Sequence, residues 1–89
     1  MEQSKKFKIE IDRHVLKILE KLEENYKRKI IEVIDKLEDF PKVRLDIKKL
    51  KGQENKFRFR VGDYRIIFEL DKENRRIIIR DLGRRESIY

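Results

Sequence analysis

The sequence contains no cysteine and no tryptophan, and it has only one histidine and one proline. Without cysteine the chain can form neither a disulfide nor a thiolate metal site. A single histidine and carboxylates scattered among lysines give no metal constellation, so we expect no metal and no small-molecule cofactor. No apolar run approaches the ~20 residues of a membrane span. The N-terminal segment also lacks the apolar core of a signal peptide, so we expect a cytoplasmic protein without membrane contact.

Charge is abundant and unevenly distributed. The 89 residues, which we expect to form a single domain (1–89), are 48% charged with a net charge of +7. Residues 1–41 hold ten Lys/Arg and ten Asp/Glu, whereas residues 42–89 hold fifteen Lys/Arg and eight Asp/Glu. The entire excess therefore lies in the second half. Guanidinium groups pair with phosphate bidentately, so an arginine-rich excess favours a polyanion partner over a merely solvated surface.

The spacing of apolar residues in the first half changes from the period of a strand to that of a helix. Residues 6–11 alternate polar and apolar, which is typical of a half-buried strand. Asp12 is placed to cap a helix over the following residues, in which apolar side chains recur every three or four positions. A second helix with the same period follows a short polar break and ends before Pro41. So short a break predicts an antiparallel helical hairpin.

The pattern of the second half predicts a meander of three antiparallel strands. Residues 57–61 alternate strictly, Gly62 and Asp63 supply a two-residue hairpin turn, and residues 64–70 form the return strand. After a polar turn, residues 76–82 give the third strand. The order strand, helical hairpin, three-stranded meander predicts an α+β fold with helices covering one face of the sheet.

Strand alternation also sorts the cations. Arg58 and Arg60 point away from the buried phase of their strand, and Arg65 in the return strand shares that face. Like charges so close repel one another unless an anion lies among them, which favours phosphate binding over neutral decoration. The lysine-rich stretch 48–51 would add attraction to phosphate by counterion release.

These residues carry a resemblance to a known family. Lys-Leu-Lys-Gly at 49–52, the basic strand and Gly-Asp-Tyr-Arg turn at 57–68, and Gly-Arg-Arg…Tyr at 83–89 resemble the RelE/ParE toxin superfamily. The resemblance implies a microbial RNase-like RelE fold and a toxin of a type II toxin–antitoxin system. Such a toxin enters the ribosomal A site, cleaves messenger RNA and is held inactive by a cognate acidic, RelB-like antitoxin.

The resemblance also implies roles for individual residues. It places Arg65, Arg85 and Tyr89 in the catalytic set. It places further cations in RNA binding, namely Arg58, Arg60, Lys49, Lys51 and Arg84. In one respect the sequence departs from the pattern: the basic strand pair is lysine in the best-known RelE toxins, and a lysine has been considered as general base. Arginine cannot be deprotonated in a protein. Either the base lies elsewhere or substrate positioning accounts for most of the catalysis.

Cleavage of RNA needs an activated 2′-hydroxyl, a stabilised phosphorane and a protonated leaving group. Arg65 and Arg85 suit the second task as fixed cations. Tyr89 could transfer protons if nearby cations lower its pKa, could stack on a base, or could simply pack on the sheet edge. Two acidic groups lie near these residues, and we expect each to pair with a local arginine: Asp81 and Glu86. We interpret the single histidine, at position 14 and far in sequence from the basic strands, as structural.

A second interpretation stays open. A ParE-like toxin would share the fold but poison a topoisomerase through protein contacts, without catalysis. The arginine set ending in Tyr89 favours the endonuclease.

Overall fold

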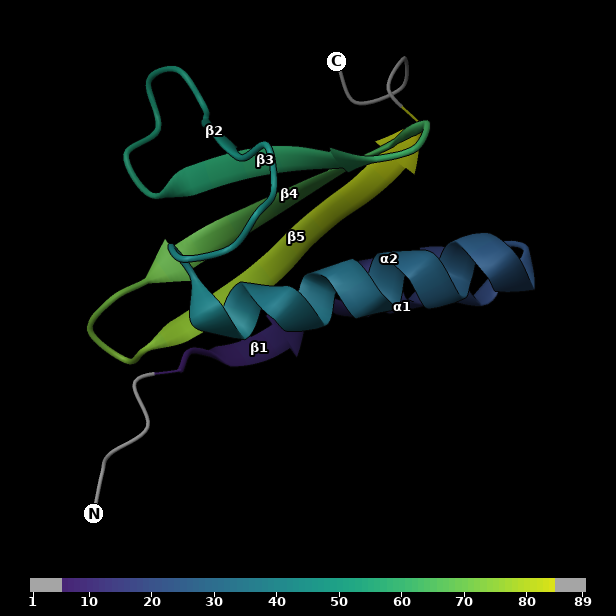
Figure 1. Cartoon of the computed structure of the whole chain (residues 1–89), viewed down its shortest axis with the longest axis horizontal. Helices are drawn as coiled ribbons and strands as arrows, with labels where there is room; N and C mark the ends of the chain where they lie inside the picture. The colour runs from purple at the N-terminus through teal and green to yellow at the C-terminus, as the bar shows by residue number, and fades with distance from the viewer. Residues whose placement is uncertain (1–5, 85–89) are drawn as a thin grey trace.

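The fold is a five-stranded sheet with two helices against it, and the computed structural model describes residues 6–84 (Figure 1). The elements in chain order are β1 (Lys8–Ile11), α1 (Arg13–Glu20), α2 (Glu24–Lys36), the 3-10 turn η1 (Leu37–Asp39), β2 (Lys48–Lys49), β3 (Lys56–Val61), β4 (Tyr64–Asp71) and β5 (Arg76–Arg84). The strand order is β1-β5-β4-β3-β2. Strand β1 pairs with β5 in parallel, and every other pair is antiparallel.

The predicted α+β layout is confirmed. Strands β3, β4 and β5 form the expected meander, and the turn between β3 and β4 falls at Gly62, whose φ of +61° is the left-handed conformation that glycine adopts without strain. The two-residue strand β2 and the parallel pairing of β1 with β5 were not predicted. Both depend on contacts between distant parts of the chain, so neither leaves a local sequence pattern.

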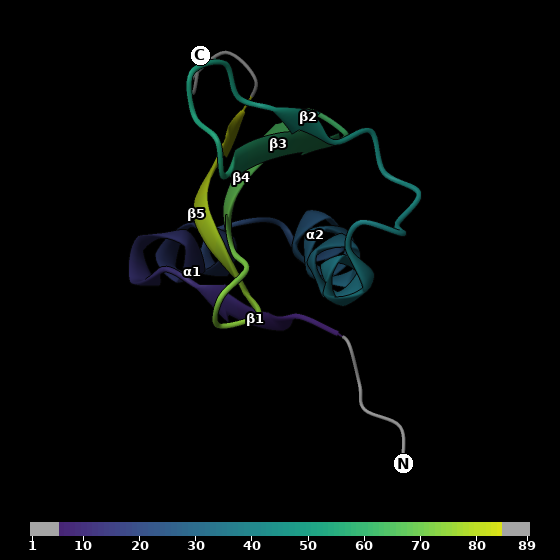
Figure 2. The same cartoon turned by 90° about the vertical axis from the view of Figure 1, so that its left-hand side faces the viewer.

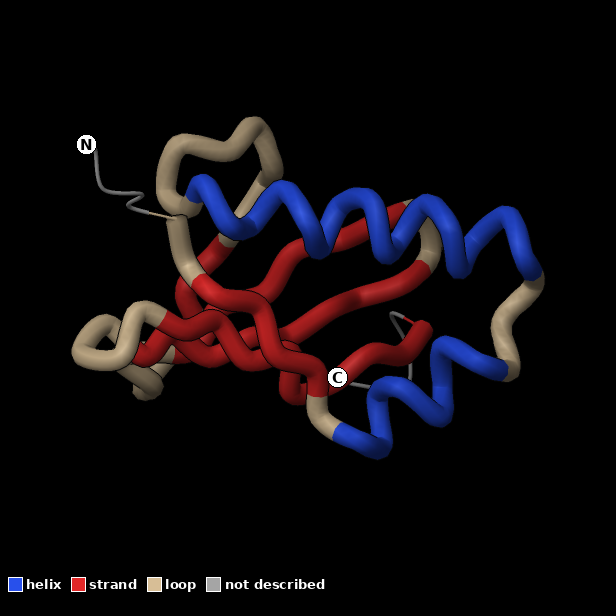
Figure 3. The backbone as a smooth tube through the Cα atoms, turned by 90° about the horizontal axis from the view of Figure 1, so that it is seen from below, coloured by secondary structure: helices blue, strands red, loops and turns tan. Residues whose placement is uncertain are grey.

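The helical hairpin is present, but its helices contact the sheet more than each other. Helix α1 packs on β5 and α2 packs on β3. Figure 2 shows the helices apart, with α1 close to β5, and Figure 3 shows them running in opposite directions. Asp12 occupies the N-cap position of α1 as predicted, yet its side chain caps no helix N–H. Both carboxylate oxygens of Asp12 instead accept hydrogen bonds from Arg80 at 3.2 Å.

A single apolar core lies between the sheet and the helices. Its fully buried side chains come from α1, α2 and η1 on one side and from β3, β4 and β5 on the other: Val15, Ile30, Ile34, Leu37, Phe59, Ile66, Phe68, Ile77 and Ile79. Phe40, which follows η1, contacts Phe57 and Phe68 edge-on. No charged side chain is buried within residues 6–84. The charged residues of the sheet therefore lie on its open face or at its ends.

A β-bulge interrupts the pairing of β4 with β5. Ile67 lies opposite Asp81, but the next residue, Phe68, lies opposite Ile79. Arg80 is thus an extra residue on β5, and the residues after it change sides relative to the preceding alternation. As a result Leu82 is buried in the core and Asp81 lies on the open face.

Residues 6–84 contain neither a membrane-spanning helix nor a cluster of metal ligands. None of the helices in this part is long and apolar enough to cross a membrane. In the same residues, no three His, Cys, Asp or Glu side chains gather closely enough to hold a metal ion.

Candidate functional site

Three arginines lie together on the open face of β3 and β4. Arg60 is directly opposite Arg65 in the antiparallel register, and Arg58 is opposite Ile67. The alternate residues of the same strands, Phe59 and Ile66, are buried in the core. We call the surface formed by Arg58, Arg60 and Arg65 the arginine face.

The described part of the chain offers the arginines of this face no side-chain partner. Within residues 6–84 none of the three forms an ion pair or a hydrogen bond through its side chain. Arg65 is half-buried, and its Nε is a buried donor without an acceptor. A buried donor left unsatisfied costs about 1–3 kcal/mol, and like charges directly opposite one another in a sheet are destabilising. An arrangement with both costs is expected where the missing partner is an external anion.

The arginines farther along the sheet differ in this respect. Arg76 binds Asp71 at 2.9 Å and Glu10 at 3.0 Å. Arg80, the residue of the bulge, binds Glu69 at 2.8 Å as well as Asp12. Hydrogen bonds to these carboxylates, Asp71 for Arg76 and Glu69 for Arg80, raise the pKa of both guanidinium groups further. That end of the sheet is therefore locally neutralised, and the uncompensated charge is concentrated on the arginine face.

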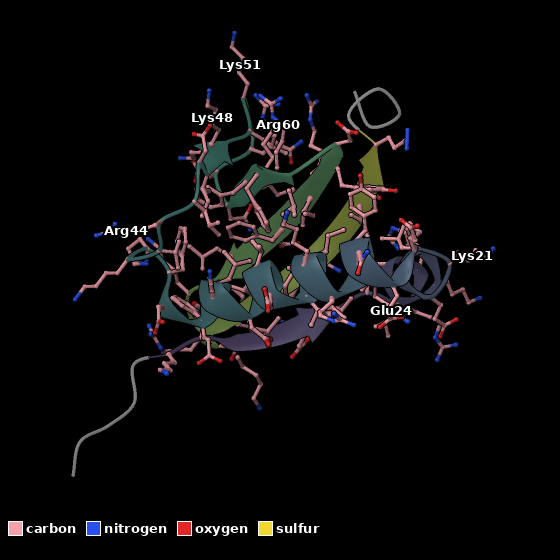
Figure 4. All side chains as sticks on the ribbon, turned by 45° about the vertical axis from the view of Figure 1, so that its right-hand side comes forward. Lys21, Glu24, Arg44, Lys48, Lys51 and Arg60 are labelled. Carbon is pink, nitrogen blue, oxygen red and sulfur yellow. The ribbon has the colours of Figure 1, made fainter. Side chains whose placement is uncertain are left out.

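The predicted lysines separate into two positions. Lys48 is opposite Arg58 and Lys49 is opposite Phe57, so Lys48 shares the arginine face and Lys49 does not. Figure 4 shows Lys48 and Lys51 at the same end of the molecule as Arg60. Lys49 was predicted to bind RNA, and the stretch 48–51 to attract phosphate. The sequence could not show which of these lysines shares the arginine face, because the register of the short strand β2 has no signature in it.

The recess beside these cations is shallow. It is lined by Asp46, Lys48, Arg58, Phe59 and Arg60 and encloses about 20 Å³. Such a recess cannot enclose a nucleotide, so the arginine face is an open surface rather than a cleft.

The C-terminal part of the predicted site is only partly described. Arg84 pairs with Tyr64 in the sheet, and its guanidinium lies 5.8 Å from the centre of the Tyr64 ring, on the side of the helices. Arg84 is therefore not on the arginine face. Arg85 and Tyr89, together with the acidic residue Glu86, lie outside the described residues.

The partner of Asp81, near the arginine face, differs from the one that the sequence predicted. The prediction that Asp81 pairs with a local arginine is wrong, because its Oδ1 lies 3.4 Å from the Nε2 of His14. The same oxygen accepts a hydrogen bond from the backbone N–H of Leu82 at 2.9 Å. His14 is half exposed, and 67 residues separate it from Asp81. No local pattern could have indicated this contact.

This geometry defines a small α+β protein whose sheet presents three arginines that no carboxylate of residues 6–84 neutralises. The chain matches the family described as ParE toxin of type II toxin–antitoxin system, parDE, over residues 2–89. It is 40% identical over 86 residues to RelE1 of Methanocaldococcus jannaschii, covering 94% of this chain and 96% of that protein.

Solved structures of toxin–antitoxin complexes contain a chain with the same fold. RelE in the archaeal RelE–RelB complex of Pyrococcus horikoshii OT3 superposes with a TM-score of 0.78 and 31% identity over 90% of this chain and 96% of that one. The toxin–antitoxin complex of Methanococcus jannaschii gives a TM-score of 0.75 and 32% identity over 90% and 94% of the two chains. The chain therefore belongs to the ParE toxin family of type II toxin–antitoxin systems, and its fold is that of RelE toxins.

Proposed function

We propose that this toxin is a ribosome-dependent endoribonuclease that cleaves messenger RNA in the A site and so inhibits translation in the cytoplasm. One observation carries the proposal. The sheet neutralises Arg76 and Arg80 with carboxylates, but among residues 6–84 no carboxylate pairs with Arg58, Arg60 or Arg65 on the arginine face. Guanidinium groups bind phosphate oxygens in bidentate fashion, so this face suits an RNA backbone.

The roles of these arginines follow from their positions. Arg65 is the most enclosed of the three side chains, with a buried Nε, and its guanidinium is the best held for stabilising the charge on a phosphorane. Arg60 is exposed at the directly opposite position and suits a neighbouring phosphate. Arg85 and Tyr89 stay in the proposed catalytic set on the strength of the family resemblance.

The shape of the site supports the proposed dependence on the ribosome. The arginine face is an open strand surface with a recess of about 20 Å³. An open face neither fixes a flexible RNA strand nor excludes water, and holding reactants in the right geometry can be worth about 7–11 kcal/mol of a barrier. A surface that holds the messenger on the opposite side would supply this positioning.

The proposed partner is a short acidic antitoxin. The two archaeal relatives described above were solved as complexes with RelB. The net charge of +7 would speed capture of an acidic chain. On the helices, Leu16 and Ile31 are 45% and 40% exposed and offer apolar contacts. Such a partner could occlude the arginine face, displace the segment carrying Arg85 and Tyr89, or make the complex too bulky for the A site.

Cleavage of a translated message tests the proposal. The purified chain should cut messenger RNA on programmed ribosomes, and Arg65→Ala should lower the rate by about 10²–10³-fold, the usual effect of removing one donor to a developing oxyanion. Arg28→Ala on α2 is the matched control, because it removes the same charge far from the arginine face. Equal activity of Arg65→Ala and Arg28→Ala would contradict the proposal, and equal cleavage with and without the antitoxin would contradict antitoxin control.

One observation favours a second function. The family that the chain matches is named after the ParE toxin. The alternative function is therefore that of a ParE-like toxin, which poisons a topoisomerase without catalysis. A supercoiling assay on purified topoisomerase distinguishes the two. Inhibition at toxin concentrations that leave ribosome-bound messenger intact would favour the ParE-like function.

A further inference from the structure

None of the three arginines that form the arginine face can accept a proton. Arginine remains protonated in proteins, and the basic strand pair here consists of Arg58 and Arg60. Cleavage of RNA through its own 2′-hydroxyl requires that proton to be removed. A neutral imidazole can accept such a proton, and the sequence contains one histidine, His14.

His14 and Asp81 form an oriented pair. The Oδ1 atom of Asp81 is fixed by the backbone N–H of Leu82 at 2.9 Å, and it faces the Nε2 of His14 at 3.4 Å. A carboxylate in this position favours the tautomer in which Nε2 carries the hydrogen and Nδ1 carries a free lone pair. The side chains are 56% and 42% exposed, so an RNA strand can reach them.

The β-bulge places this pair beside the arginine face. Asp81 is opposite Ile67 on the open side of the sheet, and Arg65 precedes Ile67 by two residues on that same side. Diagonal neighbours of this kind lie about 7–8 Å apart. Gly83, directly opposite Arg65, has no side chain to stand between them. Without the extra residue Arg80, the alternation of β5 would turn Asp81 toward the core.

We propose that His14, positioned by Asp81, is the general base that removes the proton from the 2′-hydroxyl during cleavage. The inference rests on the proposed endoribonuclease function. The 2′-oxygen attacks the adjacent phosphorus as its proton passes to Nδ1 of His14, and the bond from phosphorus to the 5′-oxygen breaks. The leaving 5′-oxygen takes a proton from water, and the imidazolium returns its proton to solvent. The products are a 2′,3′-cyclic phosphate and a 5′-hydroxyl.

Few other charged groups surround the imidazole. Asp81 faces it from β5, and Arg80 on the same strand is engaged by Asp12 and Glu69. On its own helix, Lys17 lies one turn farther along. Since His14 is exposed at the start of α1, replacing it does not disturb the core.

The test compares single-turnover cleavage on programmed ribosomes from pH 5 to pH 8.5. His14→Gln should lower the rate by about 10²–10⁴-fold, the usual contribution of a general base. Its rate should also depend less steeply on pH than that of the wild type, because the proposed proton acceptor is gone. Imidazole added to His14→Gly should restore part of the activity. Lys17→Gln, one turn away, is the matched control and should behave as wild type.

Asp81 is tested as a positioning residue. Asp81→Asn should lower the rate at saturating ribosome concentration with little change in KM, and adding it to His14→Gln should cost nothing further, because residues that act as a unit are not additive. His14→Gln with the rate and pH profile of the wild type, beside an inactive Arg65→Ala, would overturn the inference and leave the endoribonuclease intact. No cleavage by the wild type would overturn both.

Discussion

Removing one arginine from the arginine face should stabilise the protein. Arg60 and Arg65 are directly opposite one another, and no carboxylate within residues 6–84 neutralises either. Arg60 is exposed, so Arg60→Gln removes a positive charge with little loss of packing. The variant should unfold at a higher temperature than the wild type when no anion is present.

The register sets the size of the repulsion between Arg60 and Arg65. Two charges on facing positions, about 6–8 Å apart at their tips, repel by about 0.5–0.7 kcal/mol in water. Like-charged pairs in sheets fall in the same range, about 0.2–1 kcal/mol. For a domain of this size 1 kcal/mol corresponds to about 4–8 °C in Tm, so Arg60→Gln should raise the Tm by about 2–6 °C.

Thermal unfolding at two salt concentrations measures this effect. The gain should be largest at low salt and should shrink near 1 M, where the Debye length is about 3 Å. Inorganic phosphate should raise the Tm of the wild type more than that of Arg60→Gln. Arg76→Gln is the matched control and should lower the Tm, because Arg76 is held by Asp71 and Glu10. A lower Tm for Arg60→Gln at low salt would refute the argument that this face is electrostatically strained.

Three further predictions concern single residues. Arg85→Ala should abolish growth arrest with the far-UV circular dichroism unchanged, and full toxicity from a well-expressed variant would contradict a catalytic role. Tyr89→Phe and Tyr89→Ala should be equally slow in cleavage if the hydroxyl transfers protons, whereas only Tyr89→Ala should be slow if stacking matters; indifference to both would remove Tyr89 from the site. Asp71 has its pKa lowered by hydrogen bonds from Asn74 and then Arg76, so its contribution to stability is present at neutral pH and is lost as the pH falls below about 4 toward the folded-state pKa. Asp71→Asn should therefore lower the Tm at pH 7 by more than at pH 3, and an equal loss at both values would contradict this linkage.

Local patterns sufficed for most of the fold. Strict alternation in 57–61 and a glycine that tolerates positive φ fixed the β3–β4 hairpin and, with it, the shared face of Arg58, Arg60 and Arg65. Apolar spacing located both helices. These features depend on residues a few positions apart, and a sequence displays such relations directly.

Features that join distant segments were beyond the sequence. The run Ile77-Ile78-Ile79 in β5 has no period of two, so the bulge at Arg80 and the side on which Asp81 emerges left no trace in it. Which of Lys48 and Lys49 shares the arginine face could not be predicted for the same reason, because only the register of β2 on β3 decides it. His14 was interpreted as structural because it is far in sequence from the basic strands, and its contact with Asp81, 67 positions away, left no local pattern.

The central position of β5 in the sheet has a consequence for the timing of synthesis. Strand β5 lies between β1 and β4 although it is the last of the described strands to be made. Until it emerges from the ribosome, β1 has no partner in the sheet, and the apolar faces of both helices lack Ile77 and Ile79, against which the core closes. Pairing between such distant segments is slow to form. A nascent chain therefore carries the arginines of β3 and β4 before it has a framework to hold them, so the arginine face is completed only late in synthesis.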